Sequence, residues 1–195
     1  MNLKSEKLLS IFSKILFIIY LILLIWVVIF KCNIAVSLTD GYLYLKTISL
    51  KERFLIYIIP FQNHFIDFKD FVLNDTFLNV IVFIPMGLYV SYFIKNKRFL
   101  MAFVISFGAS LFLEVFQLFT LMGSYQSEDL IVNTLGGIIG YLLYKLIYKD
   151  TPRRMLILNI ISLVVIVMAI PVVIYATINT IINFDLYISI VNRTY

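Results

Sequence analysis

Five polar side chains interrupt the long apolar stretches of this chain, and they are Asn79, Glu114, Gln117, Asp129 and Asn133. A carboxylate or amide in hydrocarbon is costly unless it meets a polar partner or a ligand, so such residues mark binding sites or helix contacts. Two carboxylates in surroundings of different polarity can also act as a general acid and base. The five residues are therefore the candidate ligand-binding set.

The spacing of these residues brings them to one level of a helical bundle. Glu114 and Gln117 are three positions apart, and Asp129 and Asn133 are four apart, so each pair shares one helical face. At ~1.5 Å of rise per residue, Asn79, Glu114, Gln117 and Asn133 lie roughly 6–12 Å below the same surface, with Asp129 at its rim. We expect them to converge on a polar pocket that opens outward.

The elements that position these residues are predicted to be membrane-spanning helices. Of 195 residues, 62% are apolar and 14% are charged, and the mean hydropathy is +1.00. A spanning helix needs roughly 20 mostly apolar residues, and the apolar runs are continuous rather than alternating. The sequence predicts an all-α integral membrane bundle, a single domain over 1–195, with about five spans at 12–30, 72–94, 99–122, 130–148 and 155–178.

Charge indicates the orientation of the bundle. With the N-terminus inside, the inner segments hold Glu6 and Asp150 against ten basic residues, Lys4, Lys7, Lys14, Lys95, Lys97, Arg98, Lys145, Lys149, Arg153 and Arg154. The outer segments hold more acids than bases. The positive-inside rule therefore predicts an N-in, C-out topology. The net charge of +5 reflects this topology and anionic membrane lipid, so no nucleic-acid partner is predicted.

The segment between the first two predicted spans, 31–71, is rich in aromatic residues but too short in apolar length to cross a membrane. Such segments settle at the membrane interface or fold back onto helix ends. We expect an interfacial helix or lid over the outer mouth of the bundle. A simple connector among the lipid headgroups is the alternative.

Small residues indicate where the helices approach each other. Gly136 and Gly140 have the small-xxx-small spacing that lets backbones come together in lipid. Pro85 and Gly87 favour a kink at which a neighbouring group can satisfy a freed carbonyl. Gly108 is expected to thin the third span in a similar way. These residues would shape a pocket without taking part in chemistry.

Three motifs occur in a recognisable order. They are NVIVFIPMG at 79–87, EVFQ at 114–117 and EDLIVNTLGGIIGY at 128–141, and IPF at 59–61 precedes them. No single motif is specific, but the ordered combination resembles the VanZ-like family over about residues 50–148. That family consists of multi-pass proteins of the bacterial cytoplasmic membrane.

The resemblance implies a role in the cell envelope. The family is named for a member that confers low-level resistance to the glycopeptide teicoplanin, and its biochemical activity is not established. The chain departs from the family at one place, because a basic residue often found in the turn before the aspartate is absent. Residues 123–127 contain neither Lys nor Arg, so this turn offers no cation to Asp129.

Other kinds of chemistry have little support in the sequence. Cys32 is the single cysteine, which excludes an internal disulfide, and His64 is the single histidine and has no partner at metal-ligand spacing. No phosphate-binding glycine loop and no zinc-protease or serine-hydrolase motif occurs. We therefore predict neither a metal nor a cofactor.

Three functions remain open. The preferred prediction is a non-enzymatic protein that binds an envelope component, such as membrane lipid, a lipid-linked cell-wall precursor or a glycopeptide. The second is an intramembrane enzyme on a lipid-linked substrate with Glu114 and Asp129 as acid and base, which lacks a metal set or an activated nucleophile to support it. In the third, Asn79 and Asn133 only join helices and Asp129 caps its helix.

Overall fold

The computed structural model describes residues 3–29, 49, 51–52, 75–120, 127–147, 151–182, 185 and 189. Within these ranges the chain forms helices and no strand, which confirms the all-α prediction. The five helices are α1 (Leu3–Ile29), α5 (Asp75–Phe93), α6 (Arg98–Thr120), α7 (Ser127–Leu146) and α8 (Thr151–Ile182). Each corresponds to one predicted span, but α1 starts nine residues before the predicted 12–30, and α8 extends beyond both ends of 155–178.

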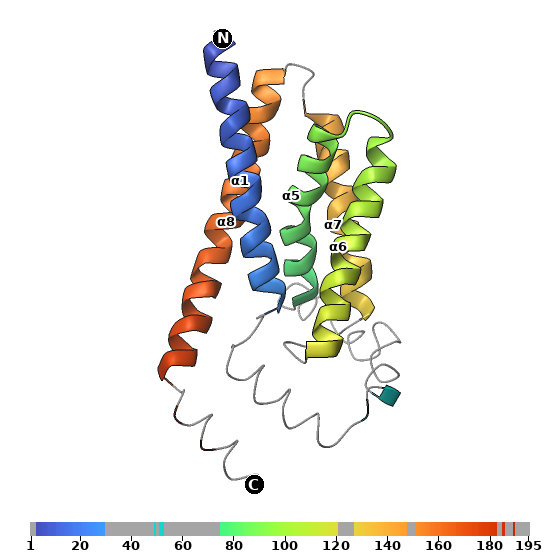
Figure 1. Ribbon diagram of the computed structural model, residues 1–195. Coiled ribbons are helices and arrows are strands. Elements are labelled where there is room, and N and C mark those ends of the chain that lie inside the picture. The colour runs from blue at the N-terminus through green and yellow to red at the C-terminus, as the bar shows by residue number, and fades with distance from the viewer. Residues whose placement is uncertain are drawn as a thin grey trace.

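Helix α5 is the centre of the bundle (Figure 1). It packs most extensively on α7 and also contacts α6, α8 and α1, while α1 packs along α8. Helices α1, α6 and α8 run in one direction and α5 and α7 run in the other. The α5–α6 turn, the last turn of α7 and the first turn of α8 therefore lie at the end where the N-terminus lies, which we call the N-terminal end.

Three of the described helices are long and apolar enough to cross a membrane. The qualifying stretches are Glu6–Val28 in α1, Arg98–Phe119 in α6 and Arg153–Asn179 in α8, and α5 offers a shorter apolar stretch, Phe77–Phe93. Their outward faces carry exposed large apolar side chains, such as Phe112 and Phe119 on α6. Surface of this kind and extent suits hydrocarbon rather than water.

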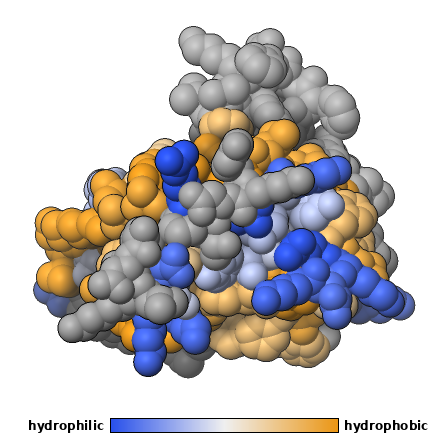
Figure 2. Space-filling view, turned by 90° about the horizontal axis from the view of Figure 1, so that it is seen from above, coloured by the Kyte–Doolittle hydropathy of each residue, from blue (hydrophilic) through white to orange (hydrophobic). Residues whose placement is uncertain are grey.

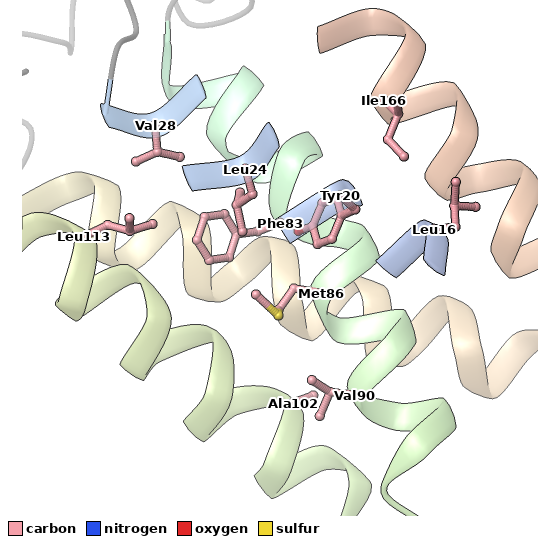
Figure 3. Close-up of a cluster of buried hydrophobic side chains, with 10 residues drawn as sticks. All are labelled: Leu16, Tyr20, Leu24, Val28, Phe83, Met86, Val90, Ala102, Leu113 and Ile166. Carbon is pink, nitrogen blue, oxygen red and sulfur yellow. The ribbon is translucent and has the colours of Figure 1, made fainter. Parts of the chain in front are cut away.

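A core of apolar side chains joins α1 to α5 and α6 (Figure 3). Leu16, Tyr20, Leu24 and Val28 follow the four-residue repeat along one face of α1. They meet Phe83, Met86 and Val90 of α5, with Ala102 and Leu113 of α6 and Ile166 of α8 completing the cluster. Away from this face and its contact with α8, α1 carries exposed apolar side chains such as Ile18 and Ile22.

Tyr20 also makes a polar contact at the proline of α5. Pro85 has no backbone N–H and disturbs the helical hydrogen bonds of the preceding turn. The Tyr20 hydroxyl donates a hydrogen bond of 2.8 Å to the carbonyl of Val82 in that turn. The carbonyl that Pro85 leaves without a helical donor is that of Ile81, four residues earlier, so this contact from α1 does not test the prediction that a neighbouring group satisfies the freed carbonyl.

Removing this hydroxyl tests the contact. Tyr20→Phe is expected to lower the free energy of unfolding by about 0.6–1.7 kcal/mol, since the ring stays in the core but the interhelical hydrogen bond is lost. Thermal melting of purified protein in neutral detergent measures the change. Tyr175→Phe is the matched control, because Tyr175 is 68% exposed on α8. Equal melting temperatures for both variants would show that the Tyr20 bond contributes no stability.

Glycines let α7 lie directly against α5. A Cβ at Gly136 would collide with the backbone carbonyl of Val80, and one at Gly140 would collide with the carbonyl of Ile84. The predicted close approach at Gly136 and Gly140 is therefore confirmed. The prediction that Gly108 thins α6 for packing is wrong, since a Cβ there would meet no atom within 4 Å.

Most of the predicted interfacial segment 31–71 lies outside the described residues, so its placement as a lid stays a prediction. Ser49 and Glu52 are described, and they form a capping box. The Ser49 hydroxyl and N–H donate to Glu52 Oε2 at 2.7 and 2.8 Å, and the Glu52 N–H donates to Ser49 Oγ at 3.3 Å. The bonds that Glu52 accepts hold the pKa of its carboxyl below the ordinary value. A helical turn therefore begins within this segment.

Candidate functional site

A buried hydrogen bond joins α5 to α7 in the half of the bundle away from the N-terminal end. Asn79 Nδ2 donates to Asp129 Oδ1 at 2.6 Å, although the two residues are 50 positions apart in sequence. Asn79 is one turn into α5 and Asp129 is in the first turn of α7, so the antiparallel packing of these helices brings them level. The Asp129 carboxylate thus reaches across to α5, which is more than a helix cap requires.

Helix α6 reaches the same level through Ser110. Asn133 Nδ2 donates to Ser110 Oγ at 2.9 Å, and Ser110 Oγ lies 3.5 Å from the backbone carbonyl of Asp129, to which it donates. Both members of the Asp129 and Asn133 pair therefore contact neighbouring helices through the face that their spacing predicts. The contact also fixes the register of α6 against α7.

Glu114 and Gln117 lie on the same face of α6, one and two turns beyond Ser110. Glu114 is 1% exposed, so its carboxylate is inside the protein and not among the lipid-facing side chains. Gln117 Nε2 donates at 2.8 Å to the carbonyl of Val28 near the end of α1. The amide of Gln117 is therefore directed to α1 and not to the amide of Asn133.

The structure brings the predicted residues into one region contributed by α5, α6 and α7 and tied to α1. We call Asn79, Ser110, Glu114, Gln117, Asp129 and Asn133 the polar layer. All six are buried, with at most 6% exposure. The outward-opening pocket above this layer stays a prediction, because 121–126 and most of 31–71 lie outside the described residues.

Two acceptors in the polar layer are not used within the described parts of the chain. Gln117 Oε1 and Asn133 Oδ1 are fully buried and accept no hydrogen bond there. A buried carbonyl oxygen without a donor costs about 1–3 kcal/mol, which a water molecule or a ligand N–H or O–H would recover. With the carboxylates of Glu114 and Asp129 beside them, the layer is suited to a ligand rich in hydrogen-bond donors.

Sequence reasoning missed several buried polar residues, and three of them, Ser106, Ser110 and Glu128, lie on α6 and α7. The two serines lie four and eight positions before Glu114, so they extend one polar stripe along α6. This repeat was readable, but serine in an apolar helix commonly bonds its own backbone, as Ser91 does with the carbonyl of Gly87 at 2.6 Å. Glu128 was assigned to the outer segments, and the structure buries it at 6% exposure.

The described residues contain no group of three His, Cys, Asp or Glu side chains that could hold a metal ion. Cys32 and His64 lie outside those residues. To a metal ion the side chains of the polar layer would offer two carboxylates and neutral oxygen atoms, but no nitrogen or sulfur ligand.

Comparison with known proteins shows that the part of the chain that contains the polar layer matches a recognised family. The VanZ/LLP1 family matches the chain over residues 17–148, from within α1 to the end of α7. Protein VanZ of Enterococcus faecium is 32% identical over 149 residues, which is 75% of this chain and 82% of that protein. No solved structure matches the chain. All six residues of the polar layer fall within the matched region.

Proposed function

The chain belongs to the VanZ/LLP1 family, and from this premise we propose that its polar layer binds a component of the bacterial cell envelope. In this proposal the chain is a multi-pass protein of the cytoplasmic membrane, its five helices cross the bilayer, and the N-terminal end faces the cytoplasm. The alternating helix directions and the basic residues at that end support this topology. The polar layer then lies in the outer half of the membrane.

The observation that carries the proposal is the buried 2.6 Å hydrogen bond between Asn79 and Asp129. It joins the first and third of the three sequence motifs, and Glu114 of the second motif lies on the face of α6 that contacts Asp129 and Asn133 through Ser110. Three separate segments thus contribute to one polar region inside otherwise apolar helices. Polar residues at this depth mark sites of binding or transfer.

The chemistry of the layer favours a ligand with hydroxyl and amide groups. Gln117 Oε1 and Asn133 Oδ1 offer acceptors, and the carboxylates offer stronger ones. A lipid-linked cell-wall precursor presents sugar hydroxyls and peptide N–H groups at the outer membrane surface. By holding such a molecule the protein would change its exposure to glycopeptides, which accounts for an influence on teicoplanin susceptibility.

A structural role is the second candidate, and the Gln117 contact favours it. The bond from Gln117 Nε2 to the Val28 carbonyl ties α6 to the end of α1 and needs no ligand. Interhelical bonds of this kind typically contribute about 0.6 kcal/mol each. If the whole layer works in this way, its loss will act through folding alone.

The proposal is tested by the pattern of drug susceptibility in a deletion strain. Deletion is expected to lower the minimal inhibitory concentration of teicoplanin selectively, with wild-type levels restored by the intact gene. Other cell-wall inhibitors and a set of lipophilic drugs provide the comparison. An equal change for all lipophilic drugs would indicate a barrier effect and would contradict precursor binding, as would no change for any drug.

A further inference from the structure

The N-terminal end of the bundle carries a second concentration of polar side chains, unrelated to the polar layer. Three chain segments meet there, namely the α5–α6 turn, the last turn of α7 and the first turn of α8. Together they contribute six basic residues, Lys95, Lys97, Arg98, Lys145, Arg153 and Arg154. We call these six residues the basic cluster. Figure 2 looks onto this end and shows hydrophilic side chains with hydrophobic ones beside them.

Two arginines of the cluster converge on one aromatic ring. The guanidinium carbon of Arg154 lies 4.6 Å from the centre of the Tyr144 ring, and that of Arg98 lies 5.5 Å from it. Arg154 also donates to the Tyr144 hydroxyl at 2.9 Å, and Arg98 Nε donates to the Ser91 carbonyl at 3.1 Å. The first turns of α6 and α8 are thus both held on one side chain of α7.

Backbone geometry adds to the positive potential of this end. Helices α6 and α8 both begin here, and their described first turns contain no acidic residue, so the positive ends of both helix dipoles add to the potential of the basic residues. Lys97 has a φ of 48°, in the left-handed region that favours glycine. The tight α5–α6 turn therefore keeps a lysine at a strained position.

Apolar side chains border the cluster. Phe93 at the end of α5, Phe99 in α6 and Leu156 in α8 are all exposed, and Leu146 at the end of α7 is 80% exposed. A partner that covers both surfaces must combine an anionic group with hydrocarbon. Neither a nucleic acid nor a free inorganic anion has this combination.

We propose that the basic cluster binds the phosphate headgroup of an anionic membrane lipid, whose acyl chains lie along the bordering apolar side chains. Charge complementarity supplies the attraction, because each Lys or Arg near an anionic membrane surface adds to the binding. The bound headgroup brings a negative charge to the end of the bundle at which both guanidiniums contact Tyr144. It thereby stabilises the junction of α6, α7 and α8 without involving the polar layer.

The test measures lipid binding by the full-length protein purified in neutral detergent. Phosphatidylglycerol or phosphatidylcholine is titrated into the protein, and the melting temperature and retained lipid are followed. Phosphatidylglycerol is expected to bind and to raise the melting temperature, whereas phosphatidylcholine is not. Inorganic phosphate at the same concentration is expected to leave the melting temperature unchanged.

A double variant locates the binding. Lys95→Gln with Lys97→Gly removes two exposed charges and relieves the strained φ, so the fold is retained, and the affinity for phosphatidylglycerol is expected to fall on the order of tenfold. The control is Lys7→Gln with Lys14→Gln, an equal charge change on α1. An equal loss in both double variants would show diffuse attraction and overturn the proposal. Equal binding of the two lipids would overturn it as well, and so would full competition by inorganic phosphate.

Discussion

Replacing Gly140 with alanine is expected to destabilise the bundle by about 2–3 kcal/mol, the upper part of the range for overpacking a closely packed site. The new Cβ would collide with the carbonyl oxygen of Ile84 and approach the backbone of Leu88 and Gly87. These are backbone atoms, so no side chain can rotate away, and α5 and α7 must separate. Because that contact sets the level of Asn79 against Asp129, the polar layer would be disturbed too. Thermal melting in detergent measures the loss.

Gly108→Ala is the matched control for this prediction. It makes the same chemical change in the middle of another apolar helix, but at a position where a Cβ meets no atom within 4 Å. Since alanine favours helix over glycine, this variant is expected to equal or slightly exceed the wild type in stability. A Gly140→Ala protein as stable as Gly108→Ala would show that α5 and α7 do not pack as closely as described.

If the proposed function holds, changing Glu114 to glutamine abolishes protection against teicoplanin, so that the inhibitory concentration falls to that of the deletion strain. Glutamine has nearly the same shape but neither the charge nor the proton-accepting strength of a carboxylate. Glu114 is 1% exposed, and glutamine keeps its shape and one hydrogen-bonding oxygen, so the free energy of unfolding is expected to fall by about 0.5–1.5 kcal/mol, the net contribution of a single hydrogen bond. Susceptibility is measured together with the amount and melting temperature of the protein.

Glu6→Gln provides the control for the loss of a carboxylate, since Glu6 lies in the first turns of α1 and away from the polar layer. This variant should protect as the wild type does. If Glu114→Gln protects equally well, the carboxylate has no functional role. If it loses protection only because it fails to fold, the structural candidate is favoured over ligand binding.

The helices were predictable because a helix that spans a membrane requires an apolar stretch of about 20 residues, and such a stretch is visible in the sequence. The sites of close approach were partly predictable, since glycines four apart, such as Gly136 and Gly140, permit backbone contact wherever a partner exists. Position 108 is also a glycine, but no partner helix lies close beside it. The sequence shows where a residue is small. It does not show whether a neighbouring helix packs against that residue.

The polar residues were predictable as a group but their partners were not. Asn79 and Asp129 were expected near one level, and the structure joins them directly. Gln117 was expected to line a pocket shared with α5 and α7, and the bond from its Nε2 to the Val28 carbonyl of α1 was not predicted. Serine gives a weak signal because it can bond its own helix, which is why Ser110 was missed although it connects α6 to α7.

If the polar layer binds a ligand, the Asp129 carboxylate does more than join α5 to α7. Exchanging the Asn79 and Asp129 side chains tests this claim most directly. The double variant Asn79→Asp with Asp129→Asn keeps the net charge and can rebuild the same hydrogen bond with donor and acceptor reversed. Each single variant is expected to lower the melting temperature, and the exchange is expected to restore it. Protection against teicoplanin should stay lost in the exchanged protein. Recovery of protection together with stability would contradict the claim and leave the pair as a helix contact alone.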